Sequence, residues 1–181
     1  MQKINVVGIS GSGKSTFSKQ LASILNATYI ELDFLFWGPD WTKPSDEIFF
    51  DKVEKKLTAT QNWVLDGNYS RTTDLKWKYA DTVIWLDYPI WLTTTRVTKR
   101  AIQRVWSQEE LWPGTGNTES FKNMVTKDGI IWWSISRYHV RKKQYEQAFS
   151  SDDYLGVEFI RLRSPKEADQ FIKDCIYSAK G

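Results

Sequence analysis

The feature that most constrains this chain is a glycine-rich segment near its start, Gly8-Ile9-Ser10-Gly11-Ser12-Gly13-Lys14-Ser15-Thr16. It satisfies the pattern G-x-x-x-x-G-K-[ST], follows the apolar run Ile4–Ile9 and opens the helical pattern Lys14–Leu25. Glycines let the backbone curl so that successive N–H groups point inward, and a helix that starts there adds its positive end. The order of strand, loop and helix therefore predicts a cradle for phosphate groups.

The residues of this loop have distinct expected roles. The glycine backbone and the short hydroxyl side chains would contact phosphate oxygens, Lys14 would reach the outer phosphates, and the Ser15 hydroxyl would ligate Mg²⁺. The loop residues that we expect to contact a nucleotide are Gly8, Ser10, Gly11, Ser12, Gly13, Lys14, Ser15 and Thr16. The expected cofactors are ATP and Mg²⁺. A GTPase is the less favoured alternative, because the Asn-Lys-x-Asp sequence with which GTPases read guanine does not occur.

Five short segments rich in β-branched and aromatic residues punctuate the chain, and helical spacing fills most of the intervals between them. Several are near-continuous apolar runs, which is typical of strands buried on both faces. The expected strands are Ile4–Ile9, Thr28–Leu32, Trp63–Leu65, Thr82–Leu86 and Val157–Leu162, and the expected helices between them are Lys14–Leu25, Ser45–Thr60, Trp91–Val105 and Pro165–Ile176. This alternation predicts an α/β fold of the P-loop NTPase type, a five-stranded parallel sheet with helices on both faces.

The alternation stops after the fourth expected strand, because residues 106–150 contain no strand pattern. Trp112–Asn117 is rich in turn residues, and the helical patterns Glu119–Lys127 and Ile130–Phe149 follow it. A length of 181 residues suits one domain. We therefore expect a single domain over residues 1–181 with a helical, lid-like insertion at about residues 106–136.

An aspartate follows each of three expected strands, at Asp33, Asp66 and Asp87. Because ligands of open parallel sheets bind beyond the carboxyl ends of the strands, these carboxylates are candidates for a site around Mg²⁺ and phosphate. The alternative is that such an aspartate caps the next helix or turns the chain. The turn interpretation suits Asp87, which precedes Tyr88-Pro89, better than it suits Asp66.

Basic residues are concentrated between residues 90 and 150. This stretch holds ten Lys/Arg and five Asp/Glu, a local charge of +5, while the rest of the chain sums to −2 and the total is +3. Arg96, Arg100 and Arg104 recur every four residues, which places them in one stripe on a helix. Arg137 and Arg141 repeat that spacing beyond the loop. Guanidinium groups match phosphate oxygens, so the pattern favours a lid over phosphates, with a solvated helix face as the alternative.

Together these motifs resemble the adenylate-kinase-type P-loop kinases, and most of all the bacterial group known as DNA topology modulation proteins. The resemblance covers most of the chain and implies the fold of nucleoside-monophosphate kinases. The segments that carry it are Gly8–Thr16, Trp63–Arg71, Asp87–Pro89 followed by Arg96 and Arg100, Glu110–Trp112, Trp132-Trp133 and Leu162–Pro165.

The resemblance also implies roles for single residues. Asp66 would hold Mg²⁺ through water, and Arg71 would contact the acceptor side. Arg96 and Arg100 would grip the donor nucleotide and its phosphates, and Arg163 and Pro165 would border its base. Arg137 or Arg141 would supply a second clamp from the lid. The residues expected to act in catalysis are Lys14, Asp33, Asp66, Arg100, Arg137 and Arg141.

The chain departs from adenylate kinases on the acceptor side. Their Thr-Gly-Asp turn after the second strand is replaced by Leu32–Trp37, and no arginine precedes Asn68. Arg71 alone supplies fewer cations than an acceptor phosphate usually binds. Asp33 instead resembles the strand-end aspartate of P-loop kinases that phosphorylate a hydroxyl group. Trp37 would then stack on a flat acceptor, although packing beneath the next helix is an equal alternative.

These observations predict an ATP-dependent kinase that transfers the γ-phosphoryl group to a small acceptor, either a nucleotide or a hydroxyl metabolite. Closure of the lid over residues 106–136 would keep water from the reaction. The alternative is a P-loop ATPase with a regulatory role linked to nucleic acid or DNA topology. A total charge of +3 and the lack of a nucleic-acid-binding motif argue against this alternative.

The remaining features bear on the compartment. Cys175 is the one cysteine, so no internal disulfide can form, and no apolar run approaches the roughly 18 residues that span a bilayer. The start of the chain, Met1–Ser10, lacks the long apolar core of a signal peptide. We therefore expect a soluble, cytoplasmic protein without a membrane partner.

Overall fold

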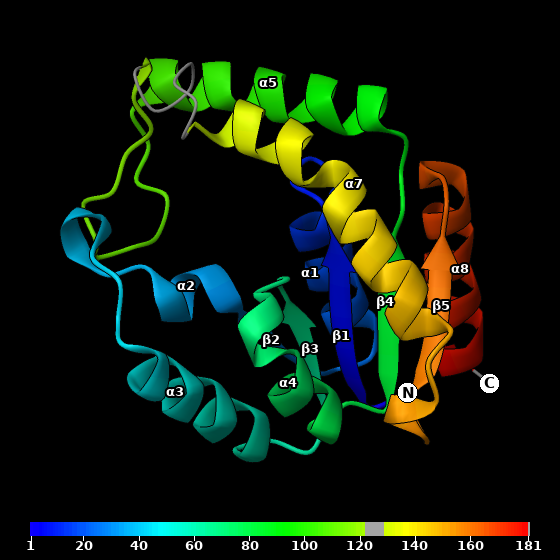
Figure 1. The fold of residues 1–181 in the computed structure, drawn as a ribbon. Coiled ribbons are helices and arrows are strands. Elements are labelled where there is room, and N and C mark those ends of the chain that lie inside the picture. Colours follow the sequence, from blue (N-terminus) through cyan, green and yellow to red (C-terminus); the bar gives the residue numbers. More distant parts are fainter. Residues whose placement is uncertain (122–128, 181) are drawn as a thin grey trace.

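Five parallel strands form one sheet in the order β2-β3-β1-β4-β5 (Figure 1). The computed structural model describes residues 1–121 and 129–180. The strands are β1 (Lys3–Gly8), β2 (Thr28–Glu31), β3 (Trp63–Asp66), β4 (Thr82–Leu86) and β5 (Glu158–Leu162). The predicted α/β class and its five parallel strands are confirmed.

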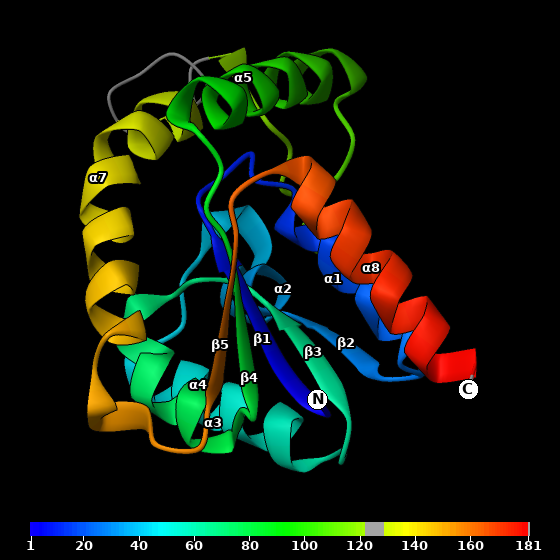
Figure 2. The same cartoon turned by 90° about the vertical axis from the view of Figure 1, so that its right-hand side faces the viewer.

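Helices cover both faces of the sheet (Figure 2). On one face lie α1 (Lys14–Ile24) and α8 (Pro165–Lys180), and on the other lie α3 (Asp46–Thr58), α4 (Thr73–Tyr79) and α7 (Ile130–Phe149). The last two helices are α2 (Leu32–Phe36), which follows β2 directly, and α5 (Ile90–Ser107), which crosses above the carboxyl ends of the strands. Single 3-10 turns lie at Pro39–Trp41, Ser70–Thr72 and Asp152–Tyr154.

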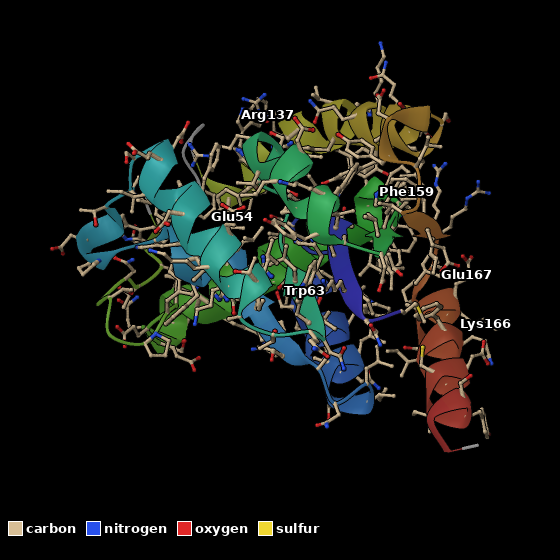
Figure 3. All side chains as sticks on the ribbon, turned by 90° about the horizontal axis from the view of Figure 1, so that it is seen from below. Glu54, Trp63, Arg137, Phe159, Lys166 and Glu167 are labelled. Atoms are coloured by element: carbon tan, nitrogen blue, oxygen red, sulfur yellow. The ribbon has the colours of Figure 1, made fainter. Side chains whose placement is uncertain are left out.

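The apolar runs of the sequence form strands because the sheet is buried on both faces. Ile4 and Val6 of β1 pack in the core beneath α1 and α8, whereas Val7 packs with Trp85 in the core beneath α7. Trp63 of β3 lies between the sheet and α3, as Figure 3 shows. Each such fully buried side chain contributes about 1.5–3 kcal/mol to folding.

Side-chain caps explain where two helices begin. The backbone N–H of Ile48 donates to Ser45 Oγ at the start of α3. At the start of α8, Glu167 N donates to Ser164 Oγ over 3.2 Å, and the Glu167 carboxylate accepts from Arg163 N over 2.8 Å (Figure 3). This arrangement differs from a capping box in that the carboxylate accepts from Arg163 N, one residue before the N-cap Ser164, and it fixes the turn between β5 and α8.

The short helices α2 and α4 were not among the expected elements, because five and seven residues are too few for a clear helical period. The predicted loop at Trp112–Asn117 is present, and α7 has the predicted bounds. Most of the helix expected at Glu119–Lys127 lies outside the described residues. Within the described part of the chain, no helix combines the length and apolar character needed to cross a membrane.

Candidate active site

The glycine-rich loop curls between β1 and α1 as predicted. Ser12 N donates to Ile9 O over 3.1 Å, and Phe17 N donates to Gly13 O over 3.0 Å to start the helix. Gly11 has a φ of +84°, and a Cβ there would lie 2.1 Å from the carbonyl oxygen of Thr93 on α5. Only glycine fits this position, so the loop and the start of α5 pack backbone against backbone.

Two buried oxygen atoms beside this loop lack a hydrogen-bond partner within the described residues, Ser12 Oγ and Asp66 Oδ1. Buried polar atoms in native proteins are almost always hydrogen-bonded or bound to a ligand. The Ser12 hydroxyl can donate to a phosphate oxygen, and the Asp66 carboxylate can accept from a metal-bound water. Together with the Ser15 hydroxyl on the first turn of α1, they suit a nucleotide with Mg²⁺.

Three carboxylates meet at the carboxyl edge of the sheet. Asp66 ends β3, Glu31 ends β2 and Asp33 lies in the first turn of α2. The hydroxyl of Tyr29 lies 3.1 Å from Asp66 Oδ2 and 3.3 Å from Glu31 Oε2. The sequence analysis had pointed to both aspartates but not to Glu31, whose pKa is raised by burial.

Asp33 accepts a 2.7 Å hydrogen bond from the Tyr69 hydroxyl. Its side chain is open to solvent, but surrounding protein displaces enough water to raise its pKa. Tyr69, Lys14 and Arg100 act in the opposite direction and favour the ionised carboxylate. The structure thus brings Lys14, Asp33, Asp66 and Arg100, four of the six expected catalytic residues, within electrostatic reach of one another.

The arginine stripe of α5 lies near the phosphate loop and the carboxylates at the sheet edge. Arg96 Nη1 lies 3.7 Å from the position of a Cβ on Gly13, and its guanidinium carbon lies 5.8 Å from the Tyr88 ring centre. Arg100 acts electrostatically on Asp33, and Arg104 acts on Glu119. Arg96 is exposed, whereas Arg100 and Arg104 are partly buried, so the use of this stripe as a phosphate clamp stays a prediction.

The arginines of α7 take different positions. Arg137 is exposed on this helix (Figure 3). Arg141 donates to Gln144 Oε1 over 3.1 Å, and its charge adds to the effect of burial in lowering the pKa of Lys76 on α4. Arg163 is exposed, and Pro165 is the first residue of α8.

Asp87 forms ion pairs with residues of the fold, in line with its interpretation as a turn residue. Its Oδ2 lies 2.6 Å from Arg161 Nη2 on β5 and 3.5 Å from Lys142 Nζ on α7. Its carboxylate thus joins the sheet to α7 and lies outside the group around Asp33.

Aromatic residues cluster beside the carboxylates at the sheet edge. Arg71 pairs with Asp46, and its guanidinium carbon lies 4.8 Å from the ring centre of Phe36 and 5.4 Å from that of Phe49. Trp37 packs edge-on against Trp41, so its predicted stacking on an acceptor stays a prediction.

The segment after α5 descends onto this aromatic wall (Figure 1). The indole of Trp112 stacks 6.1 Å from that of Trp37, and its Nε1 donates to Glu31 Oε1 over 3.2 Å. The Asn117 side chain accepts from Trp41 N and donates to Gly38 O, both over 2.9 Å. This loop therefore packs on the aromatic residues beside Glu31.

Several residues of the site were missed by the sequence analysis, namely Glu31, Tyr69, Lys76, Trp112 and Asn117. Tyr69 lies in the segment Trp63–Arg71, which was singled out as a motif, but nothing in that motif indicates its bond to Asp33. Trp112 lies in the segment Glu110–Trp112, which was also singled out, but its bond to Glu31 joins residues 81 positions apart. Asn117 binds Trp41 and Gly38, which are likewise distant in sequence, and the burial of Lys76 beside Gly67 and Asn68 depends on how α4 packs.

Comparisons with solved structures show what this architecture is. A shikimate kinase from Acinetobacter baumannii, solved with shikimate, superposes with a TM-score of 0.60 at 16% identity, covering 98% of this chain and 92% of that one. The chain has the P-loop kinase fold. A gluconokinase from Sinorhizobium meliloti 1021 has a TM-score of 0.52 at 14% identity, covering 99% of this chain and 91% of that one.

The sequence relatives match only part of this chain. The uncharacterized protein YqaC of Bacillus subtilis is 31% identical over 104 residues, 57% of this chain and 58% of that protein. A shikimate kinase of Persephonella marina is 32% identical over 104 residues, 50% of this chain and 63% of that enzyme. The similarity thus spans roughly three-fifths of each relative, and no family model matches the chain.

Proposed function

We propose that this protein is an ATP-dependent phosphotransferase that transfers the γ-phosphoryl group to a hydroxyl group of a small acceptor. The observation that carries the proposal is the position of Asp33. Tyr69 holds its carboxylate at the sheet edge, within electrostatic reach of Lys14 and Arg100. A carboxylate at this place can orient an acceptor hydroxyl and take its proton.

In the proposed reaction the acceptor hydroxyl donates a hydrogen bond to Asp33. Its oxygen attacks the γ-phosphorus, the bond from that phosphorus to the bridging oxygen breaks, and the hydroxyl proton passes to the Asp33 carboxylate. Lys14 and Arg100 offset the negative charge on the transferred group and on the leaving ADP. Mg²⁺, held by Ser15 and through water by Asp66, would supply further charge neutralisation.

The charges on the acceptor side support a hydroxyl acceptor over a nucleoside monophosphate. Arg71 is already paired with Asp46 and packed against Phe36. Glu31 and Asp33 lie on the same side of the cleft and would repel an acceptor phosphate. The shikimate kinase and gluconokinase neighbours support the same class, since their names denote small hydroxyl compounds.

The orientation of the arginine stripe also bears on a role with nucleic acid. Arg96 and Arg100 turn toward the phosphate loop and Asp33, and this supports their use in the cleft over an exposed basic surface. A DNA-binding assay at low salt, with and without ATP, separates the two roles, because backbone contacts are strongest at low salt. Binding that weakens steeply with salt would favour the alternative of a DNA-linked ATPase.

The proposal is tested by a coupled ADP-release assay with three classes of acceptor: nucleoside monophosphates, nucleosides and small hydroxyl metabolites. We expect stimulation by a compound that carries a hydroxyl and lacks a phosphate. Stimulation by nucleoside monophosphates alone would contradict the assignment of Asp33 and would place the acceptor phosphate on Arg71.

A further inference from the structure

A buried lysine lies behind the phosphate loop and has no part in the proposed reaction. Lys76 of α4 is 1% exposed, and its Nζ donates to Asn68 O over 2.7 Å and to Gly67 O over 3.4 Å. No carboxylate within residues 1–121 and 129–180 pairs with it. A buried ammonium without a counter-ion is costly, so its retention here calls for an explanation.

Asn68, whose carbonyl oxygen accepts from Lys76, is in turn hydrogen-bonded to the phosphate loop. The Asn68 side chain accepts from Gly8 N over 3.0 Å and donates to Gly8 O over 2.6 Å, so both polar groups of this glycine are held by one amide. Gly8 opens the loop, and a Cβ there would lie 2.7 Å from Ser12 Oγ and 2.9 Å from Leu86 O. The entry of the loop is therefore confined on one side by packing and on the other by Asn68.

We propose that Lys76 is a positioning residue for nucleotide binding. Its ammonium fixes the turn at Gly67 and Asn68, and the Asn68 amide then holds Gly8 and the phosphate loop in the form that receives phosphates. The buried positive charge also favours the polyphosphate that binds in front of it, because few counter-ions screen it there. This inference rests on the nucleotide binding in the proposed function, but not on phosphoryl transfer.

The ionisation of Lys76 offers a readout that packing alone would not produce. Burial lowers its pKa to about 7, and Arg141 of α7 contributes to this shift. Other charged groups around α4 are engaged elsewhere: Glu54 of α3 accepts from Tyr79, and Asp74 accepts from Tyr154. Phosphates bound in the loop would favour the ammonium form, so nucleotide binding just above neutral pH would take up protons.

The test is calorimetric titration of the full chain with MgADP at pH 6.5, where Lys76 is mostly in its ammonium form. We expect Lys76→Met to weaken binding roughly tenfold to a hundredfold, the effect of losing a hydrogen bond from a charged group. Lys78→Met, an exposed lysine on the same helix, is the matched control and should bind like the wild type. Equal affinity of Lys76→Met and the wild type would overturn the inference.

The wild type alone decides the matter if Lys76→Met does not fold. Titrations in two buffers of different ionisation enthalpy measure the protons taken up on binding. Net uptake at pH 7.5 supports the inference, and its absence overturns it. A wild type that does not bind MgADP would overturn this inference together with the proposed function, whereas normal binding without phosphoryl transfer would contradict the proposed function alone.

Discussion

The hydroxyl of Tyr69 lies 2.7 Å from Oδ1 of Asp33, although 36 residues separate them in the chain. The ring of Tyr69 is held between Phe36 and Phe49, with ring centres 4.8 and 5.1 Å away. The hydrophobic core on this face of the sheet thus extends to Asp33, the carboxylate that we propose binds the acceptor hydroxyl. Packing in that core orients the proposed catalytic group.

Tyr69→Phe should therefore impair turnover without unfolding the protein. The lost hydrogen bond stabilises the ionised carboxylate, so the pKa of Asp33, already raised by burial, should rise further. Because the ionised form is the active one, the acid limb of the pH–rate profile should move to higher pH. We expect kcat at neutral pH to fall about tenfold, the effect of one hydrogen bond to a charged group. An unmoved acid limb would argue against Asp33 as the base.

Asn117→Ala should loosen the loop that closes the acceptor side. Asn117 is 1% exposed and bonds to Trp41 N and Gly38 O, which would both lose a partner. We expect the free energy of unfolding to fall by about 1–3 kcal/mol. Relative to wild type, the KM for the acceptor should rise more than the KM for ATP. Urea denaturation and steady-state kinetics measure the two effects, with the exposed Gln103→Ala on α5 as the control. A variant as stable as this control would show that Asn117 does not hold the loop.

Lys76 should make stability depend on pH in a defined direction. Its pKa is about 7 in the folded chain and has an ordinary value of 10.5, so between these values the unfolded chain binds more protons. Stability should therefore rise with pH across this window, by at most about 1.4 kcal/mol per pH unit from this group. The measurement is the difference in unfolding free energy between wild type and Lys76→Met from pH 6 to pH 10. A difference that stays constant would mean that Lys76 titrates normally.

Asp87→Asn separates the structural aspartate from those of the site. Its side chain is 6% exposed and pairs with Arg161, which is 26% exposed. Replacement should cost about 1–3 kcal/mol of stability, because a nearly buried ion pair is broken. The KM for ATP and kcat should stay close to wild type at a temperature where the variant is folded. A selective loss of kcat with unchanged stability would place Asp87 in the reaction.

The strands and long helices could be predicted because their signal is local. β4 is a continuous apolar run, and the glycine-rich loop is recognisable from its own residues. Because the carboxyl ends of parallel strands lie at one edge of a sheet, the positions of Asp33 and Asp66 after their strands also predict that they lie close together.

The remaining parts of the site depend on partners distant in sequence. Lys76 lies in a short helix that also carries Asp74 and the exposed Lys78, so nothing in the local sequence separates it from a surface lysine until α4 packs against the sheet. Glu31 ends β2, but its bond to Trp112 joins residues 81 positions apart. The spacing of Arg137 and Arg141 likewise indicates a shared helix face, but not the distance of Arg141 from Asp33.

The central claim is tested most directly by measuring transfer of the γ-phosphoryl group from radiolabelled ATP to an acceptor that stimulates ADP release. The wild type should label the acceptor on a hydroxyl group. Asp33→Asn should keep its affinity for MgADP and lose roughly two to four orders of magnitude in transfer rate, the range for removal of a general base. Transfer by Asp33→Asn at close to the wild-type rate, or label found only in inorganic phosphate with the wild type, would contradict the account.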